Sequence, residues 1–223
     1  MKAADYEAWY HTPRGAWIGE RELFLVIAAL SPGQGDTLLD IGAGTGWFTR
    51  NVVARTGVRA VALDIDRDGL AFARERAADD TCYLQADGST LPLRDASVDH
   101  AMAITSLCFI DDDRRAVAEM LRVTRNRFAL GLLNRHSLLW WRKGRRGGTG
   151  AYRGARWHTP REALALFDGL PVADLRVQSA IHLPGGGPAA RWLESKAPAS
   201  WLTGAFLLLS GSVSDPTDYQ AMP

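Results

Sequence analysis

The sequence has few cysteines and no long hydrophobic run. Only Cys82 and Cys108 occur among 223 residues, so neither a disulfide framework nor a cysteine-rich zinc cluster can form. The longest unbroken apolar run, residues 23–30, is far shorter than the ~20 residues that cross a bilayer. The first fifteen residues lack the apolar core of a signal peptide. We therefore expect a soluble, cytoplasmic protein without a membrane partner.

Net charge is nearly absent, but the basic residues are unevenly placed. Twenty-six Lys and Arg against 25 Asp and Glu give a formal charge of +1, yet residues 120–161 contain no acid. The same segment holds eleven Lys and Arg, interleaved with Trp140, Trp141, Tyr152 and Trp157. Three interpretations stay open: a solvated loop, an RNA-binding strip, or a loop that closes over a pocket and attracts an anionic small molecule.

The periodicity of apolar residues alternates between strand and helix along most of the chain. Short links between these segments predict right-handed βαβ units and a doubly wound α/β sheet with helices on both faces. The predicted strands are 37–42, 58–66, 81–87, 98–105, 127–134, 172–183 and 204–213. The predicted helices are 20–30, 46–55, 68–78, 112–124 and one that starts with the capping box at residues 159–162.

No repeat or composition break divides the chain, which predicts a single domain over residues 1–223. We expect an N-terminal helical lid (1–35), a cofactor-binding core (36–134), and a substrate loop with C-terminal strands (135–223). Residues 12–15 (TPRG), 142–150 and 184–188 are expected to be turns or loops, and residues 214–223 to fray.

A glycine-rich turn, LLDIGAGTG at residues 38–46, follows the first predicted strand. It is not a P-loop, because no Gly-Lys-Ser/Thr follows. It fits a dinucleotide-binding turn poorly, since Trp47 occupies the third position of that pattern, where glycine or alanine is needed. Asp40, two residues before the first glycine, would repel a pyrophosphate and attract a cation. The turn therefore suits S-adenosyl-L-methionine, a nucleoside with a sulfonium and an ammonium and no phosphate.

Two further acids follow the next two strands. Asp64 ends the strand at 58–66, where a carboxylate can accept hydrogen bonds from both ribose hydroxyls. Asp87 ends the strand at 81–87 and can accept from the adenine amino group, with Gly88 beside it allowing close approach.

The runs LLDIGAGTG, VALDID and QADGSTLPLRDASVD resemble, in order and spacing, the class I S-adenosylmethionine-dependent methyltransferases, most closely the small single-domain type 11 group. The resemblance implies a seven-stranded Rossmann-like sheet whose last strand is antiparallel, and S-adenosyl-L-homocysteine as product. One departure is VTRNR (123–127), where the family has a glycine pair before the fifth strand. The implied cofactor contacts are Asp40, Gly42, Ala43, Gly44, Gly46, Asp64, Ile65, Asp87, Gly88 and Thr105.

Methyl transfer from a sulfonium mainly needs an aligned acceptor and the exclusion of water. Residues 105–112 (TSLCFIDD) would open at the transferred methyl. We interpret Phe109 as a pocket wall and Cys108 as a small buried hydrophobe rather than a nucleophile. Histidine spacing predicts no metal site, and His11 and His136 are interpreted as exposed loop residues rather than bases.

Other residues are placed near the pocket by their position in the chain. Tyr6, Trp9 and Tyr10 would form the apolar face of a helix packed on the sheet, a lid over the cofactor, or both. The expected substrate contacts are Phe109, Asn134, Arg135 and Arg156, and the candidates for a catalytic role are Tyr10, Thr105 and Arg135.

The sequence therefore predicts a methyltransferase for a small-molecule acceptor, acting as a monomer or homodimer. An anionic acceptor is the one that the pocket-closing interpretation of the basic segment favours. Three alternatives are kept: a nicotinamide-dependent oxidoreductase, a non-catalytic nucleoside-binding protein, and an RNA methyltransferase.

Overall fold

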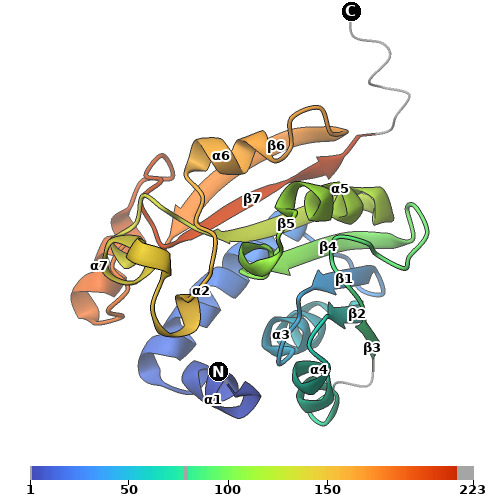
Figure 1. The fold of residues 1–223 in the computed structure, drawn as a ribbon, viewed down its shortest axis with the longest axis horizontal. Coiled ribbons are helices and arrows are strands. Elements are labelled where there is room, and N and C mark those ends of the chain that lie inside the picture. Colours follow the sequence, from blue (N-terminus) through green and yellow to red (C-terminus); the bar gives the residue numbers. More distant parts are fainter. Residues whose placement is uncertain (1, 78–79, 215–223) are drawn as a thin grey trace, which may run out of the picture.

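The structure is a computed structural model in which residues 2–77 and 80–214 are described (Figure 1). Its strands form one seven-stranded sheet in the order β3-β2-β1-β4-β5-β7-β6. All neighbours are parallel except β7, which is antiparallel to both β5 and β6. The predicted doubly wound sheet with an antiparallel last strand is confirmed. The strands are β1 (Thr37–Ile41), β2 (Arg59–Asp64), β3 (Thr81–Gln85), β4 (Val98–Ile104), β5 (Thr124–Leu133), β6 (Val172–Ala180) and β7 (Phe206–Val213).

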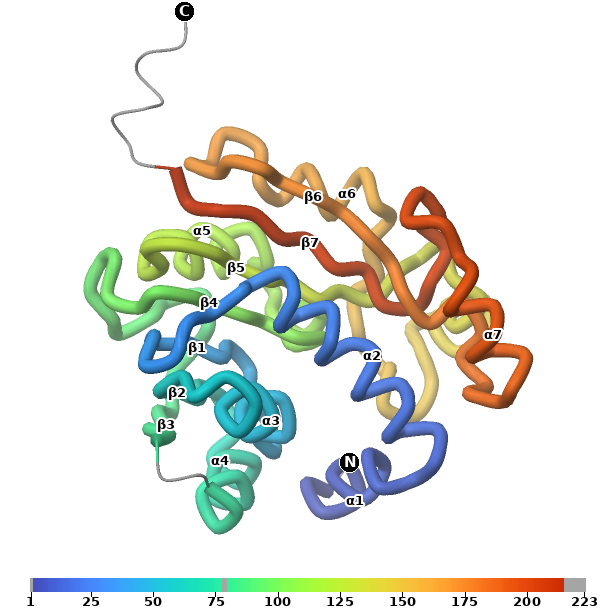
Figure 2. Tube along the Cα trace, turned by 180° about the vertical axis from the view of Figure 1, so that it is seen from behind, coloured from blue at the N-terminus to red at the C-terminus, as the bar shows by residue number. Residues whose placement is uncertain are grey.

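Helices cover both faces of this sheet, as predicted. Helices α5 and α6 lie on the face toward the viewer in Figure 1, and α2 crosses the opposite face, in front in Figure 2. The helices are α1 (Ala3–Tyr10), α2 (Pro13–Leu30), α3 (Trp47–Thr56), α4 (Arg67–Arg74), α5 (Asp113–Val123), α6 (Pro160–Ala165) and α7 (Pro188–Lys196). No helix in the described ranges is long and apolar enough to cross a membrane.

The order of the strands positions the site. Strands β2 and β3 are added in turn on one side of β1, whereas β4 and β5 are added on its other side, and all five strands are parallel. The reversal lies between β1 and β4, and open α/β sheets bind ligands at the carboxyl ends of strands at such a point. The central strands are buried on both faces: Leu38, Leu39 and Ile41 are fully buried.

Some element boundaries differ from the predictions. Residues 12–15 are not a turn but the start of α2, where Pro13 takes the first helical position and Thr12 Oγ1 accepts a hydrogen bond from Gly15 N (3.0 Å). Helix α7 was not predicted, because the glycine-rich stretch 184–188 obscures a helix that begins with Pro188. Of the segment expected to fray, all but Ser214 lies outside the described residues.

The turn before β5 needs no glycine pair. Strand β5 begins at Thr124, directly after Val123 ends α5, and Thr124 Oγ1 donates to Met120 O (2.6 Å). The pairing of β5 with β4 is irregular between Val98 and His100. In VTRNR the chain passes from α5 directly into β5 without a glycine.

Candidate active site

A cavity of about 840 Å³ opens at the carboxyl ends of the parallel strands. It lies in the range of ligand-binding pockets, ~300–1,000 Å³, near the upper end. One half, called here the cofactor half, is lined by the glycine turn and by the ends of β1, β2 and β3. The other, called here the acceptor half, is lined by α1, α2, the end of β4 and parts of residues 133–206. The two halves are continuous.

The backbone of the glycine turn forms the floor of the cofactor half. Gly42 and Gly44 have φ angles of +76° and +54°, which favour glycine. A Cβ on Gly42 would overlap Ser106, whereas a Cβ on Gly44 would meet no atom within 4 Å. Gly42 is therefore required by packing. The space above Gly44 is left open to the cavity, so a ligand can approach the backbone there.

Asp40 lies beneath this turn, buried to 2% exposure. Its Oδ2 accepts a hydrogen bond from Thr49 Oγ1 (2.6 Å). Burial raises the pKa of Asp40 to about 7, a rise opposed by Thr49 and reinforced by the charge of Asp64. A cation bound in the cavity would favour the ionised form of this carboxyl.

Asp64 and Asp87 stand at the ends of β2 and β3 on the wall of the cofactor half. Asp64 Oδ2 accepts from Gly44 N (2.7 Å) and Oδ1 from Asp66 N (2.8 Å), which leaves each oxygen a lone pair for a ligand hydroxyl. Asp87 Oδ1 accepts from the backbone and side chain of Ser89, and these bonds lower the pKa of Asp87. Asp87 can therefore accept a further hydrogen bond at neutral pH.

Apolar and small residues complete this half. Ile65 is 69% exposed and lines the cavity beside Asp64, as an apolar surface for a flat base would. A Cβ on Gly88 would approach Ile41 Cγ2 to 2.8 Å, so Gly88 lets the chain pass close to β1. Ala43, Gly46 and Thr45 belong to the turn, although Gly46 is not among the described residues that line the cavity.

Helix α1 covers the cavity and is fastened to the start of α3. The Tyr10 ring stacks on Trp47 with ring centroids 4.2 Å apart and an interplanar angle of 9°. Glu7 forms an ion pair with Arg50. Tyr6, Trp9 and Tyr10 of α1 all line the cavity, so the aromatic side chains of this helix are directed at it. Trp47, which fits a dinucleotide-binding turn poorly, thus packs against α1 and holds this helix over the cavity.

The acceptor half begins where β4 ends. Thr105 has φ +54°, an unusual conformation for a residue with a side chain, and its N–H donates to Gly131 O (2.8 Å). Ser106 Oγ donates to Ile41 O (2.5 Å) and so links the ends of β4 and β1. Phe109 is 56% exposed and lines the cavity. Cys108 is buried behind it, and burial raises the pKa of its thiol to about 12, so this thiol is a poor nucleophile.

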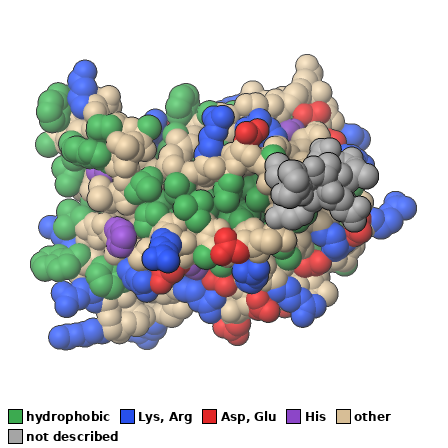
Figure 3. Space-filling model, turned by 90° about the horizontal axis from the view of Figure 1, so that it is seen from above, with side chains coloured by type: hydrophobic (Ala, Val, Ile, Leu, Met, Phe, Trp, Pro, Cys, Tyr) green, Lys and Arg blue, Asp and Glu red, His purple; other side chains and the backbone are tan. Residues whose placement is uncertain are grey.

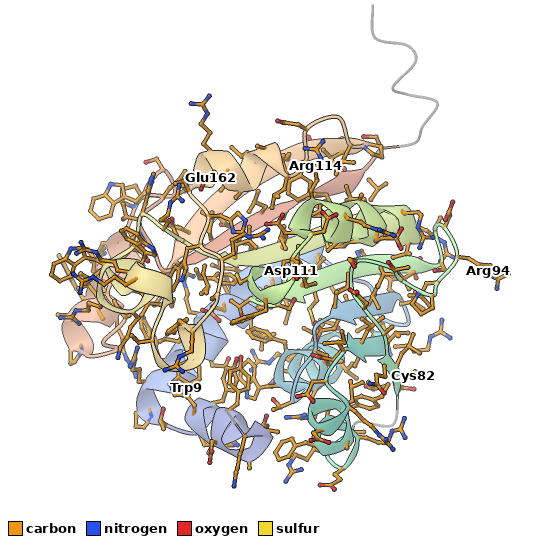
Figure 4. All side chains as sticks on the ribbon, in the orientation of Figure 1. Trp9, Cys82, Arg94, Asp111, Arg114 and Glu162 are labelled. Carbon is orange, nitrogen blue, oxygen red and sulfur yellow. The ribbon has the colours of Figure 1, made fainter. Side chains whose placement is uncertain are left out.

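Three expected substrate residues are engaged elsewhere. The Asn134 amide donates to the carbonyls of Leu202 (3.0 Å) and Gly204 (2.7 Å) and so holds a turn. The Arg135 guanidinium forms an ion pair with Glu162 Oε1 on α6 (2.5 Å); Glu162 is labelled in Figure 4. Neither of these side chains is among the described residues that line the cavity.

Arg156 is the third of them. Its guanidinium contacts Asp113 Oδ2 (2.7 Å) and donates to Asp111 O (2.9 Å). Its backbone N–H donates to Cys108 O (2.8 Å). The residue thus anchors the segment after the short helical turns at 140–152 to the start of α5. It also lies outside the described cavity lining.

Comparison with known proteins agrees with this geometry. Residues 39–128 match a family described as a methyltransferase domain. Over 107 residues the chain is 39% identical to a malonyl-[acyl-carrier protein] O-methyltransferase of Pectobacterium atrosepticum, covering 48% of this chain and 40% of that protein. It is 34% identical over 113 residues to the O-methyltransferase cnsE of Penicillium expansum, covering 48% and 41%. The chain thus spans about two fifths of the length of these relatives.

A solved structure extends the likeness to nearly the whole fold. A SAM-dependent methyltransferase of Thermotoga maritima, described as a possible histamine N-methyltransferase, superimposes with a TM-score of 0.74, at 24% identity and 94% coverage of both chains. Residues 39–128 therefore match a methyltransferase domain, and the fold of the chain is that of a SAM-dependent methyltransferase. Apart from Leu38, the matched range 39–128 includes the three runs LLDIGAGTG, VALDID and QADGSTLPLRDASVD on which the sequence resemblance rests.

The histidines lie in structural contacts or at the surface. His100, His158 and His182 are buried and contact Asp36, Asp113 and Glu194 respectively. His11 and His136 are exposed and are not among the described residues that line the cavity. Among the described residues, no group of three or more His, Cys, Asp and Glu is arranged to hold a metal ion.

Glu22 is among the residues of the acceptor half that sequence reasoning missed. It lines the cavity from α2. The sequence carries a signal for it: Glu22 falls in the apolar stripe of the helix, between Ile18 and Val26, both of which are buried. A charged residue at such a position is a candidate for a role in a cavity.

Proposed function

We propose that this protein transfers the methyl group of S-adenosylmethionine to a small-molecule acceptor bound in the acceptor half of the cavity. The observation that carries the proposal is the continuity of the cavity. One space joins the open glycine turn and its three carboxylates to a chamber lined by Tyr6, Trp9, Tyr10 and Thr105. An in-line methyl transfer needs donor and acceptor side by side, away from water.

Within the cofactor half, each residue has a distinct proposed role. Asp40 supplies negative charge beneath the ammonium and sulfonium end. Asp64 accepts from the ribose hydroxyls while its other lone pairs hold Gly44 and Asp66. The adenine lies against Ile65, with Asp87 accepting from its amino group. The remaining proposed contacts are Gly42, Ala43, Gly44, Gly46, Gly88 and Thr105.

The acceptor is proposed to present oxygen or nitrogen to the methyl group. Two relatives described above are named O-methyltransferases, which supports oxygen. An anionic acceptor would depend on the two basic residues that line the cavity, Arg14 and Lys143. With Arg135 and Arg156 held by Glu162 and Asp113, the basic segment gives an anionic acceptor less support than the sequence suggested.

RNA as acceptor is less well supported for a related reason. Stacking of bases needs exposed aromatic rings, yet Trp157 is buried and Tyr152 lines the cavity, leaving Trp141, at 61% exposure, as the most open ring of the segment. On the face shown in Figure 3, Lys and Arg side chains are scattered among acidic and hydrophobic ones. We therefore propose a small molecule.

A turnover screen tests this function. The purified protein is incubated with S-adenosylmethionine and either phenols, arylalkylamines, small carboxylic acids or bulk RNA, and S-adenosylhomocysteine is measured by mass spectrometry. We expect product with at least one small-molecule class, and none with an Asp64→Ala variant at limiting cofactor. Product with RNA alone would replace the proposal by RNA methylation. Cofactor binding without turnover of any acceptor would favour the non-catalytic protein.

A further inference from the structure

The acceptor half contains a carboxylate that the proposed cofactor contacts do not use. Arg14, Ile18 and Glu22 follow one another at four-residue intervals along α2, which places them on one face of the helix. All three line the cavity. Ile18 separates the two charged groups, so the acceptor half has a cation at one end of this helical face and an acid at the other.

Glu22 has no hydrogen bond or ion pair with any residue that the structure describes. Its neighbours on the helix are paired: Glu20 with Arg55 (2.7 Å) and Arg21 with Glu194 (3.1 Å). The acids of the cofactor half are hydrogen-bonded as well: Asp40 accepts from Thr49 Oγ1, for example. Glu22 is half-buried, and withdrawing a carboxyl from water without a partner costs free energy. An unpartnered acid in the wall of a cavity therefore indicates a group that meets a ligand.

The groups that face Glu22 are mostly phenols. Tyr6 and Tyr10 from α1 share a hydrogen bond between their hydroxyls (3.0 Å), and Tyr152 approaches from the segment after β5. The charge of Glu22 contributes to raising the pKa of all three, after the larger effect of burial. Burial in turn raises the pKa of Glu22 to about 8.

Other charges near this cluster are compensated or stand at its margin. Glu7 on α1 raises the pKa of Tyr6 and Tyr10 slightly, but it is paired with Arg50. Arg14 on α2 lowers the pKa of Tyr152, and Lys143 lines the cavity. Neither cation pairs with Glu22. A general base that works near neutral pH is expected to have a pKa raised to this region.

We propose that Glu22 is the general base that removes the proton of the acceptor during methyl transfer, an inference that rests on the proposed function. The acceptor's O–H or N–H bond breaks and its proton passes to the Glu22 carboxylate. The freed electron pair forms the bond to the methyl carbon, while the S–CH₃ pair returns to sulfur. A sulfonium and a carboxylate thus become a neutral thioether and a carboxylic acid, which later releases its proton to water.

The same cluster defines the class of acceptor. Tyr6, Trp9, Tyr10 and Ile18 provide apolar walls for a flat body. In the ionised form that acts as a base, Glu22 would repel an acceptor that is already a carboxylate, and such an acceptor needs no base. The proposed substrate is therefore an aromatic compound with a neutral hydroxyl or amine, and not a small acid.

Activity measurements test the role of the carboxylate. The acceptor is whichever phenol or arylalkylamine gives most S-adenosylhomocysteine with the wild type. We expect Glu22→Gln to lower kcat about 10²–10⁴-fold, with S-adenosylhomocysteine affinity by calorimetry within about threefold of wild type. The matched control is Glu20→Gln, on the same helix but paired with Arg55 at the surface, which should leave kcat unchanged. The wild-type kcat should rise with pH to a plateau above about pH 8, and the kcat of the Gln variant should not show this rise.

Thermal unfolding provides a readout that needs no turnover. In the unfolded chain Glu22 ionises near 4.5, whereas in the folded protein it ionises near 8. The wild type therefore loses stability as pH rises between these values, and the loss is complete above pH 8. We expect Glu22→Gln to melt at least ~3 °C above the wild type at pH 9, with a small difference at pH 5. Asp40 also titrates in this pH range, but it does so in both proteins, so its effect on stability cancels in the comparison.

The possible results of these experiments separate the role of Glu22, the class of acceptor and the proposed function. A variant that keeps the wild-type kcat and its pH limb overturns the role of Glu22 and leaves the proposed function intact. A variant that melts below the wild type at every pH, or loses S-adenosylhomocysteine binding, makes Glu22 structural and overturns the proposal as well. Turnover of small carboxylic acids but of no phenol or amine overturns the acceptor class. Absence of turnover with every acceptor overturns the proposed function itself.

Discussion

Replacing Gly42 by alanine should destabilise the protein by about 2–5 kcal/mol. The residue has φ +76°, and a left-handed conformation costs a residue with a side chain about 1–2 kcal/mol. The new Cβ would also overlap Ser106, which cannot move away easily because its Oγ donates to Ile41 O (2.5 Å). Overpacking of this kind adds roughly 1–3 kcal/mol. Urea unfolding measures the loss, and S-adenosylhomocysteine binding should be lost with it.

Gly44→Ala is the matched control, since it changes the same turn without the overlap. Gly44 has φ +54°, and its Cβ would meet no protein atom within 4 Å. We expect a loss of stability of only about 1 kcal/mol, while affinity for S-adenosylhomocysteine falls more than tenfold, because the methyl group occupies the space left for the ligand. If Gly44→Ala bound the ligand normally, the cofactor would not approach the turn at this residue.

Asp64→Ala should weaken binding of S-adenosylhomocysteine by about 1.5–3 kcal/mol, the range for hydrogen bonds to a charged group. The carboxylate has lone pairs left after those given to Gly44 and Asp66. Folding should survive, because the side chain lies at the end of β2 in the cavity wall and not in the core. Calorimetric titration gives the affinity and circular dichroism the fold.

Asp68→Ala provides the control for charge, since Asp68 is an exposed acid in the first turn of α4 and is not among the described residues that line the cavity. It should leave the affinity within about twofold of wild type. Normal binding by Asp64→Ala, or an equal loss in both variants, would make Asp64 an ordinary surface acid.

The cofactor half could be predicted from the sequence because it depends on local order. Asp40 lies in β1, and Asp64 and Asp87 stand at or just after the ends of β2 and β3, and these strands are neighbours in the sheet. Once the alternation of strand and helix indicates a parallel sheet, the carboxyl ends meet at one edge. The predicted positions of these residues therefore required no knowledge of long-range contacts.

The acceptor half depends on long-range contacts, and there prediction was weaker. The charge of Arg135 and Arg156 was visible in the sequence, but their partners Glu162 and Asp113 are distant in the chain or on another element. Glu22 was missed because α2 was predicted to begin at residue 20. Only a helix that begins at Pro13 aligns Arg14, Ile18 and Glu22 on one face. The turn chemistry of Thr12 and Pro13 was the signal that would have corrected this.

The central claim is that the open glycine turn and its carboxylates hold S-adenosylmethionine and not a dinucleotide. Isothermal titration of the wild-type protein with S-adenosylhomocysteine and, separately, with NAD tests it most directly. We expect saturable binding of S-adenosylhomocysteine at a single site and no detectable heat from NAD at the same concentrations. Tighter binding of NAD than of S-adenosylhomocysteine would contradict it.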